Sequence, residues 1–187
     1  MVDRLPEVVG EVRARFSCGN TLAELRGPTV CEVIDYDEMM RVANRLGPDP
    51  LNPDRRGKES ARFITKVISS KKTIGELLMD QSVIAGIGNV YRAELLFRAG
   101  IEPHTPGKKL TELQLIDLWN DSVKLLKVGV KTSFMITRDE LFTKRPSKVD
   151  RNWVYKREGQ PCRACGKKIQ IELMVGRKLY WCATCQR

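Results

Sequence analysis

Apolar residues in the middle of the chain recur every three or four positions, which is the spacing of amphipathic helices. Residues 61–69 gather apolar side chains on one face, and residues 112–128 do the same. Three pairs fit helix-capping patterns, namely Asp35 with Glu38, Thr73 with Glu76, and Thr111 with Gln114. We therefore expect helices over residues 36–46, 61–69, 73–81 and 112–128, packed together as a helical domain.

The last part of the chain shows a different pattern. Apolar and polar residues alternate over Ile169–Leu173, and the apolar Leu179 and Tyr180 follow a short segment that contains Gly176. This alternation predicts a β-hairpin with its turn near Gly176. The fold class predicted for the whole chain is therefore mainly α with a small β part.

A glycine-bearing turn separates two of the predicted helices. One helix ends near Gln81, and the next begins at Asn89 and runs to about residue 99. Gly86 and Gly88 allow the backbone to approach a ligand, and the free amides at the second helix start favour an anion. These residues predict either a backbone anion site or an ordinary helix–helix turn with Asn89 as its cap.

The charge of the chain is unevenly distributed. Residues 1–54 carry 6 Lys and Arg against 10 Asp and Glu, and residues 55–187 carry 27 against 13. A basic segment of this kind is typical of proteins with a polyanionic partner, although solubility alone also explains it. No apolar run approaches the roughly 18 residues of a membrane-spanning helix, and the N-terminus has no apolar signal core. We expect no membrane partner and a cytoplasmic location.

Four of the six cysteines form two close pairs near the C-terminus. Cys162 and Cys165 form one pair, Cys182 and Cys185 the other, and sixteen residues separate the pairs. This spacing predicts a tetrahedral zinc site rather than disulfides, because no secretory signal is present. Four thiolate ligands leave no open position on the metal, so the predicted Zn²⁺ is structural.

The predicted zinc site has a consequence for Arg177. The metal fixes the open end of the hairpin, so the opposite tip, with Arg177, extends from a rigid support. A cation held in this way suits the recognition of an anion. An ordinary solvated turn arginine is the alternative interpretation of the same residue.

These segments together resemble the formamidopyrimidine-DNA glycosylase and endonuclease VIII family, with a preference for the endonuclease VIII branch. Residues 78–91 resemble its helix-two-turn-helix motif, and residues 161–186 resemble its C-terminal zinc finger. The resemblance covers residues 20–187. It implies remnant β-strands, a helix-two-turn-helix domain and a zinc-finger hairpin.

The family relation also implies a partner and a set of contacts. Its members are DNA repair enzymes of base excision, acting as DNA glycosylases and AP lyases, that flip a damaged base out of the duplex. Asn89, with the backbone around Gly88, would bind phosphates beside the damaged nucleotide, and Arg177 would bind them from the other side. We expect the partner to be double-stranded DNA with a damaged base or an abasic site, bound by a monomer near the bacterial nucleoid.

The resemblance does not extend to the family's catalytic residues. Family members begin Met-Pro-Glu, whereas this chain begins Met1-Val2-Asp3. We therefore expect the catalytic proline, glutamate and lysine to lie upstream of residue 1, and no catalytic residue is assigned here. Thr21–Arg26 and Thr29–Ile34 resemble the closing strands of the family's β-sandwich lobe. Without the rest of that lobe, residues 1–34 should be less ordered than residues 60–187.

Three domains follow from these assignments. Residues 1–54 are the remnant of the β-sandwich lobe with one helix and a linker, residues 55–150 the helix-two-turn-helix domain, and residues 151–187 the zinc finger. Cys18 and Cys31, which lack metal-ligand spacing, are interpreted as small core residues, and His104 as a surface loop residue.

Three functions fit the sequence. The chain is a DNA glycosylase and AP lyase family member with its catalytic N-terminus missing, a damaged-DNA-binding module without chemistry, or a zinc-ribbon protein of transcription or translation. The linked presence of both motifs argues against the third.

Overall fold

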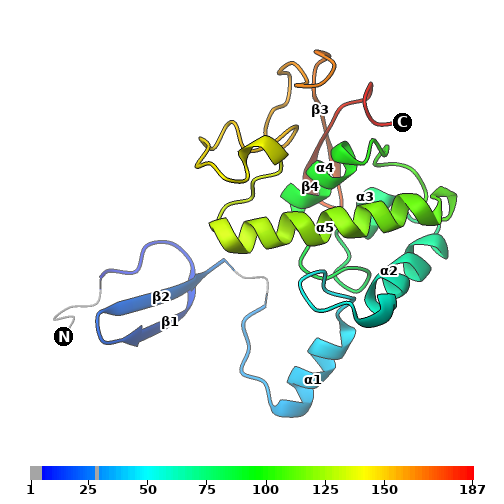
Figure 1. Ribbon diagram of the computed structural model, residues 1–187. Coiled ribbons are helices and arrows are strands. Elements are labelled where there is room, and N and C mark those ends of the chain that lie inside the picture. The colour runs from blue at the N-terminus through cyan, green and yellow to red at the C-terminus, as the bar shows by residue number, and fades with distance from the viewer. Residues whose placement is uncertain (1–5, 28–29) are drawn as a thin grey trace. The chain divides into compact units, whose positions relative to one another are not determined.

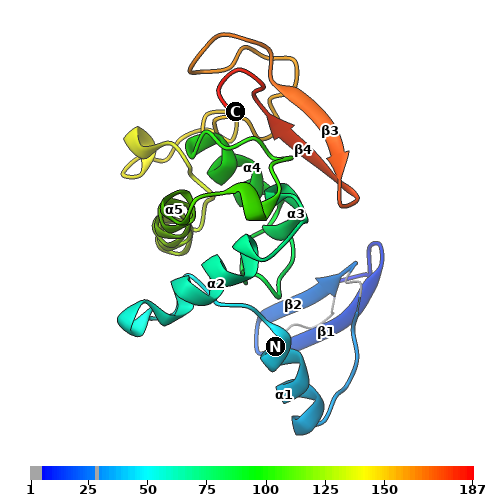
Figure 2. The same cartoon turned by 90° about the vertical axis from the view of Figure 1, so that its right-hand side faces the viewer.

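The computed structural model describes residues 6–27 and 30–187. The chain divides into two compact units, Met1–Ala43 and Asn44–Arg187 (Figures 1 and 2). Residues just after the division belong with the second unit. The Gly47 amide donates to the Gln81 carbonyl at 2.8 Å, and the Ala85 amide donates to the Pro48 carbonyl at 2.9 Å.

The first unit contains one β-hairpin and most of one helix. Strands β1 (Val12–Cys18) and β2 (Thr21–Arg26) pair antiparallel through a turn at Gly19, whose φ is +54°. Helix α1 follows over Tyr36–Arg45. The strand predicted over Thr29–Ile34 is wrong for residues 30–34, which have no regular structure, whereas Thr29 lies outside the described residues. The physical reason is that β2 pairs with β1, a strand the sequence prediction had missed, and no described strand pairs with residues 30–34.

The first unit has no buried side chain among its described residues, 6–27 and 30–43. Cys18 and Cys31 are exposed, so their interpretation as core residues is wrong. A single two-stranded sheet has no second layer within this unit to cover either face. Its main side-chain interaction is polar: Arg15 Nε donates to Glu24 Oε1 at 2.8 Å, and hydrogen bonds from Arg15 and Arg26 lower the pKa of Glu24.

Four helices and three short 3-10 segments build the helical part of the second unit. The helices are α2 (Lys58–Ile68), α3 (Ile74–Leu77), α4 (Asn89–Arg98) and α5 (Glu112–Thr132), and the 3-10 segments are η1 (Arg55–Gly57), η2 (Gly107–Lys109) and η3 (Asp139–Leu141). The capping boxes of Thr73 and Thr111 are confirmed. Helix α3 is shorter than predicted, because the Asp80 side chain accepts from the Ser82 amide at 3.0 Å and starts a turn.

The core of the second unit lies between its helices. Phe63 of α2 and Trp119 of α5 meet with ring centroids 5.7 Å apart, and Leu95 and Leu96 of α4 are fully buried in the same cluster. Helices α4 and α5 approach closely at Gly129, where an added Cβ would lie 2.3 Å from the Tyr91 hydroxyl oxygen. Figure 2, which views α5 nearly end-on, shows α4 between α5 and the C-terminal hairpin.

The C-terminal hairpin is the predicted one. Strands β3 (Gln170–Met174) and β4 (Arg177–Trp181) pair antiparallel, with Met174 opposite Arg177. The two turn residues, Val175 and Gly176, both have positive φ, as a tight hairpin turn requires. The hairpin packs on α4 through a second core cluster that includes Phe97, Ile169 and Tyr180. No helix over the described residues is long and apolar enough to cross a membrane.

Candidate functional site

The turn between α3 and α4 is closed by one side chain. Gln81 Nε2 donates to the Ile87 carbonyl at 2.8 Å, and Gln81 Oε1 accepts from the Gly86 amide at 3.0 Å. Gly86 has a φ of +81°, a conformation that side-chain-bearing residues rarely adopt. Gln81 and Gly86 together fix the path of the chain into α4. The sequence analysis had assigned Gln81 only as a helix end.

Within residues 6–27 and 30–187, the first-turn amides of α4 have no hydrogen-bond partner. Gly88 is the N-cap residue, no side chain caps the helix, and its first backbone hydrogen bond runs from the Arg92 amide to the Gly88 carbonyl at 2.9 Å. A Cβ at Gly88 would meet no atom within 4 Å. The space beside Gly88 is therefore open, and the helix dipole makes the start of α4 favourable for an anion.

Asn89, the first residue of α4, contacts the hairpin. Its Nδ2 donates to the Lys178 carbonyl of β4 at 2.8 Å. Arg177 is the preceding residue of β4 and is exposed. The Asn89 side chain therefore contacts β4 at the residue that follows Arg177. Gly88, Asn89 and Arg177 are called the clamp residues below.

Arg92 lies behind the clamp residues. It is fully buried, its Nη1 donates to the Met174 carbonyl at 3.1 Å, and its Nη2 donates to Asn89 Oδ1. Nη2 also lies 3.5 Å from the Lys178 carbonyl. Arg92 thus joins the helix start to both strands of the hairpin. Its Nε is buried without a hydrogen-bond partner among residues 6–27 and 30–187.

The charge of Arg92 is only weakly compensated. Burial lowers its pKa to about 10, and the nearby Arg177 guanidinium acts in the same direction, while Glu172 opposes both. Arg92 and Arg177 therefore both contribute positive charge beside the start of α4. Arg92 was not among the residues predicted from the sequence. Its signal was a charged residue three positions after Asn89 and on the same face of the helix.

Glu94 connects α4 to the segment that leads into the finger. This carboxylate is fully buried, and it accepts from the backbone amides of Trp153, Val154 and Tyr155 at 2.7–2.8 Å. The Thr137 hydroxyl donates to it as well. Burial raises the pKa of Glu94, and the four donors act against that shift. The helix that carries Asn89 and the segment before the finger are therefore held as one structure.

The four C-terminal cysteines are brought together as predicted. Their Sγ atoms all lie within 4.8 Å of one another. Cys162 and Cys185 Sγ are 3.9 Å apart, and Cys165 and Cys182 Sγ are 3.5 Å apart. Tetrahedral zinc bonded to sulfur at about 2.3 Å requires sulfur–sulfur separations of roughly 3.8 Å. The donor set therefore fits a structural Zn²⁺.

The four thiols differ in how readily they ionise. The Lys167 amide lowers the pKa of Cys165 to about 7, whereas burial and the neighbouring thiols raise the pKa of Cys182 and Cys185. Four thiolates in so small a volume repel one another strongly without a cation. Bound Zn²⁺ would supply that charge and cross-link the two cysteine pairs.

A basic cavity of about 430 Å³ lies beside the start of α4. Val90, the residue after Asn89, lines it together with Tyr155 and four cationic side chains, which are Lys148, Arg151, Lys156 and Arg157. No Asp or Glu is among its lining residues. The cavity combines apolar walls with positive charge, which suits a ligand that carries both an aromatic ring and a phosphate.

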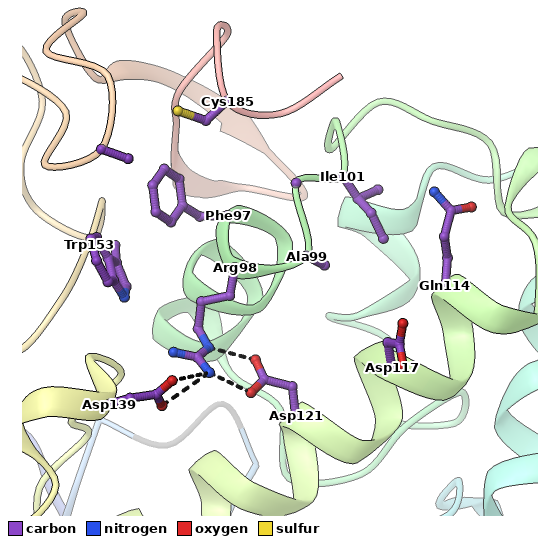
Figure 3. A pocket seen from close by; sticks show the side chains of 12 residues that line it. Phe97, Arg98, Ala99, Ile101, Gln114, Asp117, Asp121, Asp139, Trp153 and Cys185 are labelled. Carbon is purple, nitrogen blue, oxygen red and sulfur yellow. Dashed lines mark hydrogen bonds and ion pairs between the residues drawn. The ribbon is translucent and has the colours of Figure 1, made fainter.

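A larger cavity of about 710 Å³, shown in Figure 3, has the opposite character. Asp117, Asp121 and Asp139 line it, and Arg98 is held between two of them, with Nε 2.7 Å from Asp121 and Nη2 3.2 Å from Asp139. Arg98, the only cation among the described residues that line this cavity, is therefore neutralised. Its acidic walls disfavour a phosphate, which leaves the α4 side of the hairpin as the candidate site.

His104 takes part in a small polar cluster at the hairpin. Its Nε2 lies 2.9 Å from Glu172 Oε1, and its ring packs edge-on against Trp181 with centroids 5.4 Å apart. His104 is partly exposed and not close to the cysteine cluster's donor set. It links the loop after α4 to β3 and contributes no metal ligand.

Comparison with known proteins identifies the class of this fold and site. Residues 46–140 match the family described as the formamidopyrimidine-DNA glycosylase H2TH domain. Endonuclease 8 1 of Mycobacterium tuberculosis is 47% identical over 186 residues, which cover 97% of this chain and 68% of that protein. The formamidopyrimidine-DNA glycosylase of Prochlorococcus marinus is 35% identical over 153 residues, which cover 80% and 53%.

Solved structures give the same result. The MutM (Fpg) protein of Thermus thermophilus superposes with a TM-score of 0.74 at 29% identity, covering 96% of this chain and 70% of that one. A Lactococcus lactis Fpg in complex with abasic-site DNA superposes with a TM-score of 0.66 at 26% identity, covering 82% and 57%. The fold is thus that of a helix-two-turn-helix protein with a four-cysteine finger. The chain belongs to the formamidopyrimidine-DNA glycosylase and endonuclease VIII family of base-excision-repair proteins, as its sequence motifs predicted.

Proposed function

We propose that this chain binds double-stranded DNA at an abasic site or damaged base, with the clamp residues on the phosphates that flank the lesion. The hydrogen bond of 2.8 Å from Asn89 Nδ2 to the Lys178 carbonyl carries the proposal. It holds the open amides of α4 next to the strand on which Arg177 is exposed. Backbone amides and a guanidinium are the donors that proteins use for phosphate.

The charge of the second unit supports a polyanionic partner. The excess of cations after residue 54 attracts DNA at long range, and the clamp residues then bind individual phosphates. We assign residues 55–150 to the helix-two-turn-helix part of this interface and residues 151–187 to the finger. One copy of the chain carries both parts, so we expect a monomer to bind, in association with the nucleoid.

The cavity beside Val90 supplies the second element of the proposal. Extruding a nucleotide from the duplex requires a pocket that receives it and contacts that hold the neighbouring backbone. A volume of about 430 Å³, a wall from Tyr155 and a basic lining suit a nucleotide. The Lactococcus lactis relatives were solved with DNA that contains an abasic site or Fapy-dG, which fits this assignment.

The experiment is a titration of abasic and undamaged duplexes at several salt concentrations. Arg177→Ala should weaken abasic-duplex binding and reduce the slope of log affinity against log salt by about 0.9 for each lost phosphate contact. Lys168→Ala is the matched control, because it removes an exposed cation from the same finger, outside the clamp. An unchanged slope in a folded Arg177→Ala chain, or an equal effect of Lys168→Ala, would refute the proposal.

The second candidate function is damaged-DNA binding without chemistry, in contrast to glycosylase and lyase activity. No catalytic residue is assigned on this chain, and the proposed role of the clamp residues is binding alone. Borohydride trapping on an abasic duplex separates the two. A covalent adduct demonstrates lyase chemistry, whereas specific binding without an adduct supports a binding module.

A further inference from the structure

A second basic cavity lies at the C-terminal end of α5. Its volume is about 690 Å³, and no Asp or Glu is among its lining residues. The cavity is lined by two aromatic rings and four cationic side chains, which are Phe134, Phe142, Lys131, Lys144, Arg145 and Arg151. This lining differs from that of the acidic cavity around Arg98, although both lie in the second unit.

The cations of this cavity are not neutralised by the protein. Lys131, Lys144 and Arg145 are exposed, and within the described part of the chain none of them forms an ion pair. Two other cations, one on α5 and one shortly after it, are paired: Lys124 lies 2.9 Å from Asp139, and Arg138 binds Glu140. Four cations therefore line a cavity whose described lining residues include no acidic side chain, and these cations repel one another unless an anion is bound.

Arg151 links this cavity to the one beside Val90. Its guanidinium lies 4.0 Å from the centroid of the Phe134 ring, and its Nε donates to the Pro146 carbonyl at 3.2 Å. The stacked guanidinium is thereby held in one orientation. Because Arg151 lines both cavities, they adjoin at this side chain.

We infer that this second cavity binds the phosphodiester backbone of DNA at phosphates beyond the nucleotide held by the clamp residues. The inference rests on the proposed function and extends it. The four cations of this cavity adjoin the cavity beside Val90, where the nucleotide is proposed to bind. Several separate cations suit successive phosphates better than one small anion. These contacts carry no base information, so they contribute equally to damaged and undamaged DNA.

The test uses the full chain and two triple variants of equal charge change. Lys131→Gln with Lys144→Gln and Arg145→Gln removes cations from the cavity. The control variant is Lys71→Gln with Lys108→Gln and Lys109→Gln, which removes three exposed cations elsewhere in the second unit. Thermal unfolding verifies that both variants are folded. Binding of abasic and undamaged duplexes is then titrated against salt.

The cavity variant should lower the salt slope by up to about 2.7, since each phosphate contact contributes about 0.9, and it should weaken both duplexes by the same factor. The control variant should change the slope by less than half of that amount. Equal slopes for the two variants would overturn the inference, because net charge alone would then explain the effect. A loss of affinity for the abasic duplex alone, with binding of the undamaged duplex unchanged, would also overturn the inference.

Failure of this inference can be distinguished from failure of the proposed function. If Arg177→Ala weakens abasic-duplex binding and the cavity variant binds like the unmodified chain, the clamp stands and this inference fails. If the unmodified chain does not distinguish abasic from undamaged DNA, while the cavity variant still flattens the slope, the clamp fails and the cavity remains a phosphate site.

Discussion

At the scale of single residues, the site depends on side chains that do not themselves face a ligand. Arg92 ties Asn89 to the carbonyl of Met174, and Glu94 ties α4 to the segment before the finger. Both are charged groups that are fully buried. Buried charges are costly unless they are hydrogen-bonded, so their presence in α4 indicates that the position of this helix matters.

Arg92→Met is the sharpest test of that interpretation. The variant keeps a side chain of similar length but leaves Asn89 Oδ1 and the Met174 carbonyl without their donor, at a cost of about 1–3 kcal/mol. We expect weaker abasic-duplex binding with the zinc content unchanged, and partial recovery with Arg92→Lys. Fluorescence anisotropy measures the affinity, and zinc release with a thiol reagent measures the metal. Binding by Arg92→Met equal to that of the unmodified chain would contradict a positioning role.

At the scale of elements, the hairpin β3–β4 is stabilised at both ends. The cysteine cluster lies at the open end, and contacts from Asn89 and Arg92 hold the end near the turn. Gly75 of α3 leaves room for the Met174 side chain, because an added Cβ would lie 2.5 Å from its Sδ. The position of Arg177 therefore depends on two helices and on the metal site together.

Removal of the metal should release the hairpin. Chelation is expected to unfold the finger and abolish abasic-duplex binding, while α2 and α5, which have their own core, remain helical. Cys162→Ser should have the same effect. Cys18→Ser with Cys31→Ser is the matched control and should retain one zinc per chain, since both thiols are exposed in the first unit. Near-ultraviolet circular dichroism and zinc analysis report the result, and a chelated finger with unchanged spectra would contradict the prediction.

At the scale of the whole molecule, the two units differ in their cores. The second unit buries two hydrophobic clusters, whereas the first has no buried side chain among its described residues. We therefore predict that amides of β1 and β2 exchange with solvent faster than those of α4 and α5. Hydrogen exchange followed by mass spectrometry measures this directly. Slower exchange in β1 and β2 than in α4 would show that the first unit is stabilised in some other way.

The sequence predicted local structure better than contacts between distant segments. The capping boxes at Thr73 and Thr111, the start of α4 and the hairpin turn were each marked by residues with strong local preferences. The cysteine cluster followed from spacing. The lack of a strand over residues 30–34 could not be predicted from the local sequence, because strand formation depends on a partner elsewhere in the chain.

The same limit explains which site residues were missed. Asn89 and Arg177 were found through their motifs, but the roles of Arg92 and Glu94 arise from carbonyls and amides more than 50 residues away. Backbone groups have no sequence signature of their own. A buried arginine or glutamate in an apolar helix predicts that such partners exist without indicating which segment supplies them.

The central claim is that Asn89 and Arg177 act on DNA as a single clamp. A double-mutant cycle of Asn89→Ala and Arg177→Ala, measured as affinity for an abasic duplex at fixed salt, tests it most directly. Because the Asn89 side chain is hydrogen-bonded to the backbone of β4 at the residue after Arg177, we predict a coupling of about 0.5 kcal/mol or more between the substitutions. Strictly additive losses would mean that the two residues act independently, and no loss in either variant would contradict the clamp itself.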